Sequence, residues 1–389
     1  MDSARKQVKA LAPAPFVQQL IRQLIISPPK IAQLAIHDLT RPLGSQKKWI
    51  KRFKNNHWKG VLIGENIKKD SEETALDRLK NADIVIYEIH GGGFRLGHCQ
   101  MYMDAFIQWV TLLKENHGVN AIIMSVEYGL APKVQYPVPI HQCVASYNYL
   151  TKDLGVSPSK IIVSGDSAGG AIALEMLCHV YAPQLLHQTD GKRTNFDLDL
   201  PAGILLCSPV TSVNQTSESW KKYESTDLVS HKLFYLVIKE YIGLKTNNLD
   251  EIPMLKIFKH LSEHGGMDQI CNGNVLFVVG NKEVFSDDIL KFVDGVKKNS
   301  NKVKVNTIKS DYCHDWYLIR EIVRQEDKPM LQLCDKVVAK WFYRAVDQYK
   351  NTPSSSSSST SVEVNEKDGF FLPNPPLDDP IITTPIVLA

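Results

Sequence analysis

The segment Gly165-Asp166-Ser167-Ala168-Gly169 places a serine between two glycines in the pattern Gly-x-Ser-x-Gly. A short apolar run at residues 160–164 leads into this segment, and a helical pattern at residues 168–182 leads out of it. A serine on such a sharp turn from strand to helix holds its hydroxyl above the sheet, where the oxygen can attack a carbonyl carbon. The flanking glycines leave room for the turn. The pattern therefore predicts that Ser167 is a nucleophile.

A second glycine-rich segment, His90-Gly91-Gly92-Gly93-Phe94, follows the apolar run at residues 82–89. Consecutive glycines let backbone N–H groups turn toward one point, and in acyl transfer that point is where the carbonyl oxygen becomes an oxyanion. We expect the N–H groups of Gly91, Gly92 and Ala168 to bind this oxyanion, and His90 to brace the loop. A phosphate-binding turn is a poorer match, because the segment lacks Gly-x-Gly-x-x-Gly spacing and a P-loop lysine.

A serine hydroxyl is a weak nucleophile at neutral pH and needs a base within reach. In sites built on a strand–turn–helix serine, the acid and then the histidine follow the serine along the chain. His314 is the only histidine in the loop after the alternating run at residues 303–308. We therefore predict that His314 is the base.

The acid is expected in the loop that follows the apolar run at residues 274–279, and Glu283 lies in that loop. Its carboxylate would hold one imidazole nitrogen while the other nitrogen takes the serine proton. Asp287 and Asp288 lie in the same loop and are expected to cap the helix predicted at residues 288–298. Glu283 is the first candidate for the acid, and Asp287 remains the alternative.

These residues need a scaffold, and short apolar runs alternate with longer helical patterns along the chain. Strands are predicted at residues 82–89, 120–126, 160–164, 202–207, 274–279 and, near the edge of the sheet, 303–308. Helices are predicted at residues 105–115, 139–154 and 168–182. Strand–helix alternation of this kind predicts an α/β fold, with a mainly parallel sheet and helices on both faces.

Three segments fall outside this alternation. Residues 1–57 precede the first predicted strand, and residues 213–265, with a helical pattern at residues 231–242, interrupt the main domain at residues 58–350. We expect the first segment and this insertion to pack together as a cap above the sheet. Residues 351–389 begin with a serine run and continue with acidic and proline-rich sequence, which predicts a disordered tail.

Together, the HGGGF and GDSAGG segments, the loop with Glu283 and the late His314 resemble the hormone-sensitive-lipase family of α/β-hydrolases, which includes arylacetamide deacetylases and steryl acetyl hydrolases. Residues 127–132 (EYGLAP), followed by Tyr136-Pro137, are similar to that family's D-Y-R-L-A-P segment. The resemblance spans about residues 58–320. It implies the α/β-hydrolase fold, with a mostly parallel eight-stranded sheet, helices on both faces and a helical cap, and ester hydrolysis without a metal or other cofactor.

The resemblance also implies roles for single positions. The family's oxyanion glycines, nucleophile and base correspond in order to Gly91 and Gly92, Ser167 and His314. The chain departs from the family pattern at Glu283 (usually aspartate), Phe285 (leucine), Gly129 (arginine) and Asp315 (glycine). The extra methylene of glutamate changes the reach of the carboxylate at the acid position.

The expected reaction is hydrolysis of a short acyl ester, in the first place an acetyl ester, of a bulky apolar alcohol such as a sterol. Apolar segments at residues 16–26 and 233–241 are suited to line a pocket for such a substrate. One alternative is an amidase that acts on arylacetamide-like substrates. Another is an inactive member that only binds a ligand, although the presence of His314 argues against it.

The overall composition excludes some partners and favours one type of compartment. The formal net charge of +3 over 389 residues is too small, and the basic residues too dispersed, for nucleic-acid binding. Seven cysteines without a C-x-x-C pair argue against a disulfide framework or a zinc site and favour a reducing compartment. We expect the protein in the cytosol or on the surface of an intracellular membrane such as the endoplasmic reticulum.

The N-terminal region predicts an amphipathic helix at residues 15–27, with Val17, Leu20, Ile21 and Leu24 on one face. No apolar run reaches the roughly 18 residues needed to span a bilayer, and no signal peptide is evident. The helix is expected to cover part of the fold, and peripheral contact with a membrane is the alternative. A mitochondrial targeting segment is a third interpretation, because Asp2 is the only acidic residue before Asp38.

Overall fold

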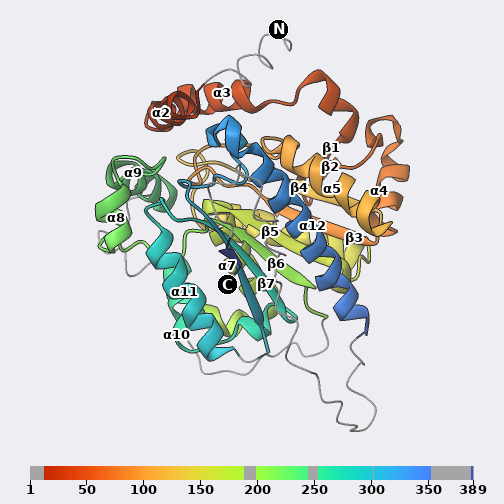
Figure 1. The fold of residues 1–389 in the computed structure, drawn as a ribbon. Helices are drawn as coiled ribbons and strands as arrows, with labels where there is room; N and C mark the ends of the chain where they lie inside the picture. Colours follow the sequence, from red (N-terminus) through yellow and green to blue (C-terminus); the bar gives the residue numbers. More distant parts are fainter. Residues whose placement is uncertain (1–12, 188–198, 244–252, 301, 352–386, 389) are drawn as a thin grey trace, which may run out of the picture.

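The computed structural model describes residues 13–187, 199–243, 253–300, 302–351 and 387–388, and Figure 1 shows how their elements are arranged. The described strands form one nine-stranded sheet in the order β1-β2-β4-β3-β5-β6-β7-β8-β9. Strands β3 to β8 are parallel, whereas β2 is antiparallel to β1 and β4, and β9 is antiparallel to β8. The strands are β1 (Ile50–Lys54), β2 (Lys59–Ile63), β3 (Ile84–Ile89), β4 (Ala121–Val126), β5 (Ile161–Asp166), β6 (Gly203–Cys207), β7 (Asn274–Gly280), β8 (Lys304–Ser310) and β9 (Val387–Leu388).

The predicted α/β fold is confirmed, and all six predicted strands are present within two residues of their predicted ends. The central strands are apolar because both of their faces are covered. In β3, Val85, Tyr87 and Ile89 belong to one hydrophobic core, whereas Ile84 and Ile86 belong to the core on the opposite face.

Helices cover both faces of the sheet, as Figure 1 shows. On one face α5 (Met103–His117) packs against α12 (Lys328–Asn351), with Trp109 and Phe342 in edge-to-face contact. The opposite core takes apolar side chains from helices that include α4 (Glu72–Lys80), α6 (Val138–Asn148), α7 (Ser167–Tyr181), α10 (Pro253–Glu263) and α11 (Ser286–Asn299).

The structure differs from the predicted boundary at residue 57, because β1 lies within residues 1–57 and pairs with β2. The sequence of β1, IKRFK, reads as polar since Lys51, Arg52 and Lys54 surround two apolar residues. The strand lies at the edge of the sheet, where charged side chains remain in water and oppose pairing with another chain. Because charged residues interrupt its apolar pattern, the sequence does not predict this strand.

The predicted cap insertion at residues 213–265 divides into two parts. Helices α8 (Glu218–Tyr223) and α9 (His231–Ile242) lie beyond the carboxyl edge of the sheet, as expected for a cap (Figure 1). Helix α10 instead packs against α11 and α7 in the layer that covers the sheet. Its buried side chains include Ile257, Phe258 and Leu261, and they join the main core.

Most of the tail predicted to be disordered lies outside the described residues. The structure describes two parts of residues 351–389: Asn351 ends α12, and Val387–Leu388 pair with β8 as β9. This pairing adds a ninth strand to the predicted eight.

Two N-terminal helices, α2 (Ala14–Ile25) and α3 (Pro29–Thr40), complete a layer that lies over the carboxyl edge of the sheet together with α8 and α9 (Figure 1). We call residues 14–40 and 217–242 the roof. Arg22 donates to the carbonyl oxygens of Glu224 and Asp227 at 2.6 and 2.9 Å, which ties α2 to the segment after α8. The buried Arg95 side chain donates to the carbonyl oxygens of Ile25 and Ser27.

No helix within the described ranges has the length and apolar character needed to cross a membrane.

Candidate active site

Ser167 lies at the turn from β5 into α7 and has a φ of +48°, in the left-handed region that a non-glycine residue rarely adopts. The turn is tight enough that a Cβ on Gly169 would come within 2.1 Å of the carbonyl oxygen of Ile89. Such strain persists only where the surrounding structure fixes it, and it directs the serine hydroxyl away from the helix. The Ser167 Oγ atom lies 2.8 Å from His314 Nε2.

His314 follows β8, and Glu283 follows β7, so the parallel order of the sheet brings both loops beside Ser167. The Nδ1 atom of His314 is 2.9 Å from Glu283 Oε2. The other carboxylate oxygen, Oε1, accepts a hydrogen bond of 3.0 Å from the backbone N–H of Gly280. All three predicted side chains are buried, and hydrogen bonds connect Ser167 through His314 to Glu283.

Asp287 and Asp288, the other carboxylates near Glu283, do not reach His314. Asp287 Oδ2 accepts a hydrogen bond of 2.7 Å from the backbone N–H of Ser219, and Asp288 Oδ2 lies 3.3 Å from Trp220 Nε1. Both side chains thus bind the first turn of α8, although they were expected to cap α11. The geometry favours Glu283 over Asp287 as the partner of the imidazole.

The glycine loop differs from the prediction at one position. The N–H of Gly91 donates a hydrogen bond of 2.8 Å to Asp166 Oδ1, and this loop position does not line the cavity. Gly92 (φ +102°) and Gly93 (φ +61°) line the cavity, and their N–H groups have no acceptor within the described part of the chain. The prediction that Gly91 donates to an oxyanion is therefore wrong, because its N–H is already used to fix the loop.

Ala168 follows Ser167 in the first turn of α7, where a backbone N–H has no partner within the helix. His90 stacks on Tyr128 with ring centroids 4.3 Å apart and does not line the cavity, in keeping with its expected role in bracing the loop. The Tyr128 hydroxyl donates to the His90 carbonyl oxygen at 2.6 Å. Tyr102, which no sequence pattern identified, donates to Asp166 Oδ2 at 2.6 Å.

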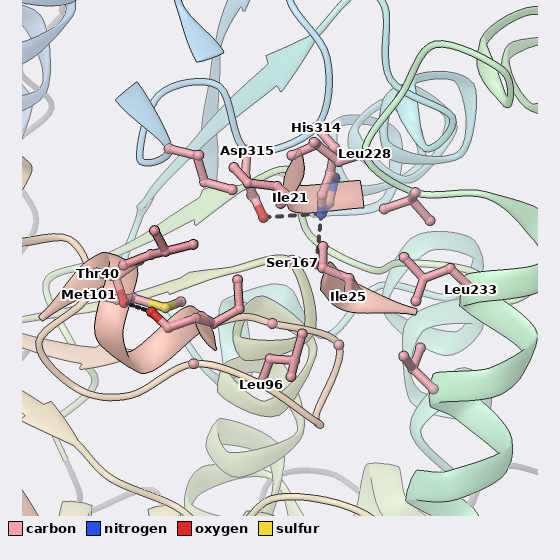
Figure 2. Close-up of a pocket in the computed structure, with 18 of the residues that line it drawn as sticks. Ile21, Ile25, Thr40, Leu96, Met101, Ser167, Leu228, Leu233, His314 and Asp315 are labelled. Atoms are coloured by element: carbon pink, nitrogen blue, oxygen red, sulfur yellow. Dashed lines mark hydrogen bonds and ion pairs between the residues drawn. The ribbon is translucent and has the colours of Figure 1, made fainter. Parts of the chain in front are cut away.

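A cavity of about 210 Å³ opens above Ser167 and His314, and Figure 2 shows the side chains that enclose it. We call the loops that carry the polar groups, residues 90–97, 166–169, 280–286 and 311–316, the floor. The roof supplies apolar walls from α2, α3 and α9. The roof residues that line the cavity are Phe16, Val17, Leu20, Ile21, Ile25, Ile36, Leu39, Thr40, Leu228, Val229, Leu233, Phe234 and Val237.

A family model described as the alpha/beta hydrolase fold matches residues 86–318, which include every residue of the floor. The chain belongs to this family. The predicted resemblance and fold class are thereby confirmed. Within the described residues of this α/β-hydrolase, no group of three or more His, Cys, Asp or Glu side chains is arranged to hold a metal ion.

Curated relatives of this α/β-hydrolase include "Lipase 2" of Moraxella sp. (strain TA144), which is 26% identical over 252 residues covering 60% of this chain and 54% of that protein. The arylacetamide deacetylase of Bos taurus is 30% identical over 183 residues, 42% of this chain and 43% of that protein. The neutral cholesterol ester hydrolase 1 of Bos taurus is 27% identical, over 46% of this chain and 40% of that protein. The chain thus spans about half the length of the curated relatives it matches.

Solved structures share the fold of this α/β-hydrolase. An esterase from the bacterial hormone-sensitive lipase family superimposes with a TM-score of 0.63, covering 85% of this chain and 97% of that one at 19% identity. An esterase/lipase from an uncultured bacterium gives a TM-score of 0.63 at 17% identity, with the same coverage.

Asp227, in the segment between α8 and α9, is a fully buried residue of the α/β-hydrolase site that sequence reasoning missed. Its Oδ1 accepts a hydrogen bond of 2.8 Å from the His314 N–H, and its Oδ2 accepts one of 2.7 Å from the Val284 N–H. One carboxylate from the roof thereby fixes both the loop that carries His314 and the loop that carries Glu283. An aspartate in a polar linker carries no motif, so only the fold reveals this role.

Asp315 was noted in the sequence as a departure from the family pattern, and the structure places it beside the imidazole of His314. Its Oδ2 lies 3.1 Å from His314 Nε2, the nitrogen that also faces Ser167 (Figure 2). Asp315 is 4% exposed and has a φ of +56°. The imidazole therefore has a carboxylate at each nitrogen, Glu283 at Nδ1 and Asp315 at Nε2.

Burial alone would lower the pKa of His314, but the carboxylates of Asp315 and Glu283 outweigh burial and hold this pKa well above its usual range. Burial raises the pKa of Asp227 to about 7, and the nearby imidazole opposes that rise. Burial also raises the pKa of Glu283, again against the effect of His314. The floor thus concentrates carboxylates around one imidazole and favours the charged form of the ring.

Proposed function

We propose that this chain is a serine carboxylic ester hydrolase that works through an acyl-enzyme on Ser167. The observation that carries this proposal is the hydrogen-bonded chain from Ser167 Oγ through His314 to Glu283, with distances of 2.8 and 2.9 Å, at the end of an apolar cavity. A family match alone identifies a fold and not a reaction. The three side chains add the means to activate a hydroxyl.

In the first half of the proposed reaction, His314 Nε2 takes the proton of Ser167 Oγ as this oxygen attacks the carbonyl carbon of the ester. The negative charge that forms on the carbonyl oxygen is bound by the N–H groups of Gly92, Gly93 and Ala168. The bond between the carbonyl carbon and the alcohol oxygen then breaks. His314 gives its proton to that oxygen, and the alcohol leaves.

In the second half, a water molecule attacks the acyl group on Ser167 while His314 takes one of its protons. The tetrahedral intermediate forms again, the bond to Ser167 Oγ breaks, and His314 returns the proton to this oxygen. The acid product leaves and the enzyme is restored. Glu283 holds the imidazole orientation through both halves and stabilises the charged ring.

The proposed substrates are short acyl esters, acetyl esters first, of bulky apolar alcohols, with sterols among the candidates. Apolar side chains from three roof helices form the cavity walls, which favours an apolar substrate. Relatives named arylacetamide deacetylase and neutral cholesterol ester hydrolase are in keeping with this class.

Hydrolysis of p-nitrophenyl acetate and labelling by a fluorophosphonate probe test the proposal. We expect the wild type to turn over the ester and to be labelled, and Ser167→Ala to lose labelling and at least about 10⁴-fold in kcat. Ser45→Ala, which changes an exposed serine, is the control and should behave as the wild type. A folded wild-type protein that neither reacts with the probe nor releases p-nitrophenol would exclude the proposed reaction.

Amide hydrolysis is a second candidate, because the same acyl-enzyme can form from an amide and one relative is named arylacetamide deacetylase. Matched substrates, phenyl acetate and acetanilide, separate the two activities. We expect a higher kcat/KM for the ester, since its leaving group departs more easily. Faster turnover of the anilide would assign the chain to amides.

A further inference from the structure

Exposed apolar side chains gather on the two N-terminal helices. Eight large apolar residues are exposed in the described part of the chain, and six of them lie between Phe16 and Leu39. Their exposed fractions are 60% for Phe16, 38% for Leu20, 37% for Ile26, 58% for Ile31, 72% for Leu34 and 40% for Leu39. A concentration of this kind on one surface marks a site of interaction, whereas single exposed apolar residues do not.

These two helices are held in place by specific contacts. Arg22 binds backbone carbonyl oxygens after α8, and Gln33 Nε2 donates to the Arg95 carbonyl oxygen at 2.9 Å. The opposite side of the pair packs on the fold, where Ala32 and Ile36 contact Leu96. The exposed apolar face is therefore a fixed feature of the fold.

The same face surrounds the opening of the cavity. Phe16, Leu20 and Leu39 line the cavity and are also among the exposed residues, so they mark its mouth. Ile31 and Leu34 are exposed but do not line the cavity, so they extend the apolar surface beyond the mouth. A protein partner or a second copy seated on this surface would cover the mouth. A lipid layer would instead supply apolar molecules to it.

Basic residues accompany and follow the two apolar helices along the chain. From Pro13 to Lys51 the chain has one acidic residue, Asp38, and six basic residues, Arg22, Lys30, Arg41, Lys47, Lys48 and Lys51. Arg41, Lys47 and Lys51 line one groove beside α3, together with Arg52 and Lys68. Lys30, Lys47 and Lys48 are exposed. Basic side chains beside an apolar face are the combination that binds the surface of an anionic membrane.

We propose that the exposed face of α2 and α3, with the basic residues that follow it, docks on an anionic lipid surface and thereby places the mouth of the cavity against the lipid. Docking itself is independent of the proposed esterase activity. The entry of an apolar ester from the lipid into the cavity rests on that proposed function.

Flotation with lipid vesicles tests the docking. Vesicles of phosphatidylcholine with about one fifth phosphatidylserine are mixed with the full chain, and the fraction of protein that floats gives a partition coefficient. We expect the double variant Ile31→Gln/Leu34→Gln to bind about tenfold or more weakly than the wild type, since two side chains no longer insert into the lipid. Val138→Gln is the control, because Val138 is 45% exposed but lies on α6, and its binding should match the wild type.

The contribution of charge is tested on the same vesicles with Lys47→Gln/Lys48→Gln. This variant should bind severalfold more weakly to the anionic vesicles and equally to vesicles of phosphatidylcholine alone. Turnover of dissolved p-nitrophenyl acetate should be unchanged in both double variants, because none of the four residues lines the cavity. Binding measured with Ser167→Ala separates docking from catalysis, since that variant should still float.

Two results would overturn the docking proposal. The first is equal flotation of the wild type and Ile31→Gln/Leu34→Gln, or no flotation of either. The second is a wild-type dimer in sedimentation velocity that the same double variant abolishes while no vesicle binding is found. The second result would assign the face to another copy of the chain.

Discussion

The floor and the roof of the cavity differ in what holds their residues in place. In the floor, buried polar side chains and backbone groups bind one another, as in the hydrogen bonds that join Glu283 to His314 and to the Gly280 N–H. Apolar contacts and a few long side chains that reach backbone carbonyls hold the roof, as Arg95 and Arg22 do. Loss of a buried hydrogen-bond partner is costly and local, whereas an apolar wall tolerates changes of shape. Substitutions of the hydrogen-bonded, buried residues of the floor should therefore change the rate for every substrate. Substitutions of the roof residues that line the cavity or anchor the roof should change selectivity or stability.

The largest effect is expected from Glu283, the proposed acid. Glu283→Ala should lower kcat by about 10³- to 10⁴-fold, because the imidazole loses the group that orients it and stabilises its charge. Asp287→Ala should lower kcat only severalfold, because Asp287 binds the first turn of α8 and does not contact His314. Steady-state kinetics with p-nitrophenyl acetate measures both. The reverse order would move the acid to Asp287.

Arg95 links the floor to the roof, and its buried guanidinium forms an ion pair with Glu240. Arg95→Met removes this guanidinium and should lower the free energy of unfolding by about 3 kcal/mol. Urea denaturation measures the change. Lys221→Met removes an ion pair with Glu218, in which the Lys221 side chain is 63% and the Glu218 side chain 81% exposed. This variant should lower the free energy of unfolding by about 1 kcal/mol or less. Similar losses in the two variants would refute the anchoring role of Arg95.

Asp315 is expected to shift the pH at which the proposed reaction sets in. Only the neutral imidazole of His314 can take the serine proton, so kcat/KM should be low below the raised pKa of His314 and should increase as the pH rises through it. Asp315→Asn removes one carboxylate from the ring and leaves Glu283 and Asp227 in place. This change should lower that pKa, and the rise in kcat/KM should move by about one unit toward acid pH.

The control for this pH effect is Asp311→Asn. Asp311 is exposed and lies in the same loop as Asp315, and its carboxylate accepts a hydrogen bond from Asn281. The pH–rate profile of this variant should coincide with that of the wild type. Asparagine tolerates the left-handed backbone at position 315, so a merely structural defect is not expected. An unchanged profile for Asp315→Asn would show that the carboxylate does not act on the base.

The smallest effect is expected in the wall of the roof. Leu233→Ala removes a side chain of α9 that lines the cavity, and it should raise the ratio of kcat/KM for p-nitrophenyl butyrate over the acetate by about three- to tenfold. Tyr235→Ala changes an exposed residue of the same helix that does not line the cavity, and it should leave this ratio unchanged. Equal ratios in all three proteins would mean that α9 does not limit the acyl group.

The sequence alone predicted the parts of this protein that depend on local order along the chain. Ser167, Glu283 and His314 could be found because each follows an apolar strand, and parallel strands bring their carboxyl ends to one edge of a sheet. Strand β1 was missed because edge strands carry charge, and Gly91 was misassigned because the sequence does not reveal which amide Asp166 binds.

Only the tertiary structure decided the contacts between segments that lie far apart in the sequence. Asp227 is 87 residues from His314, and Arg95 is 70 residues from Ile25, yet each pair is joined by a hydrogen bond. Neither residue belongs to a periodic pattern or a motif, because a hydrogen bond requires only that two groups meet in space. Asp315 lies on the Nε2 side of the imidazole because its own backbone adopts a left-handed turn. The residue type aspartate does not by itself determine this turn.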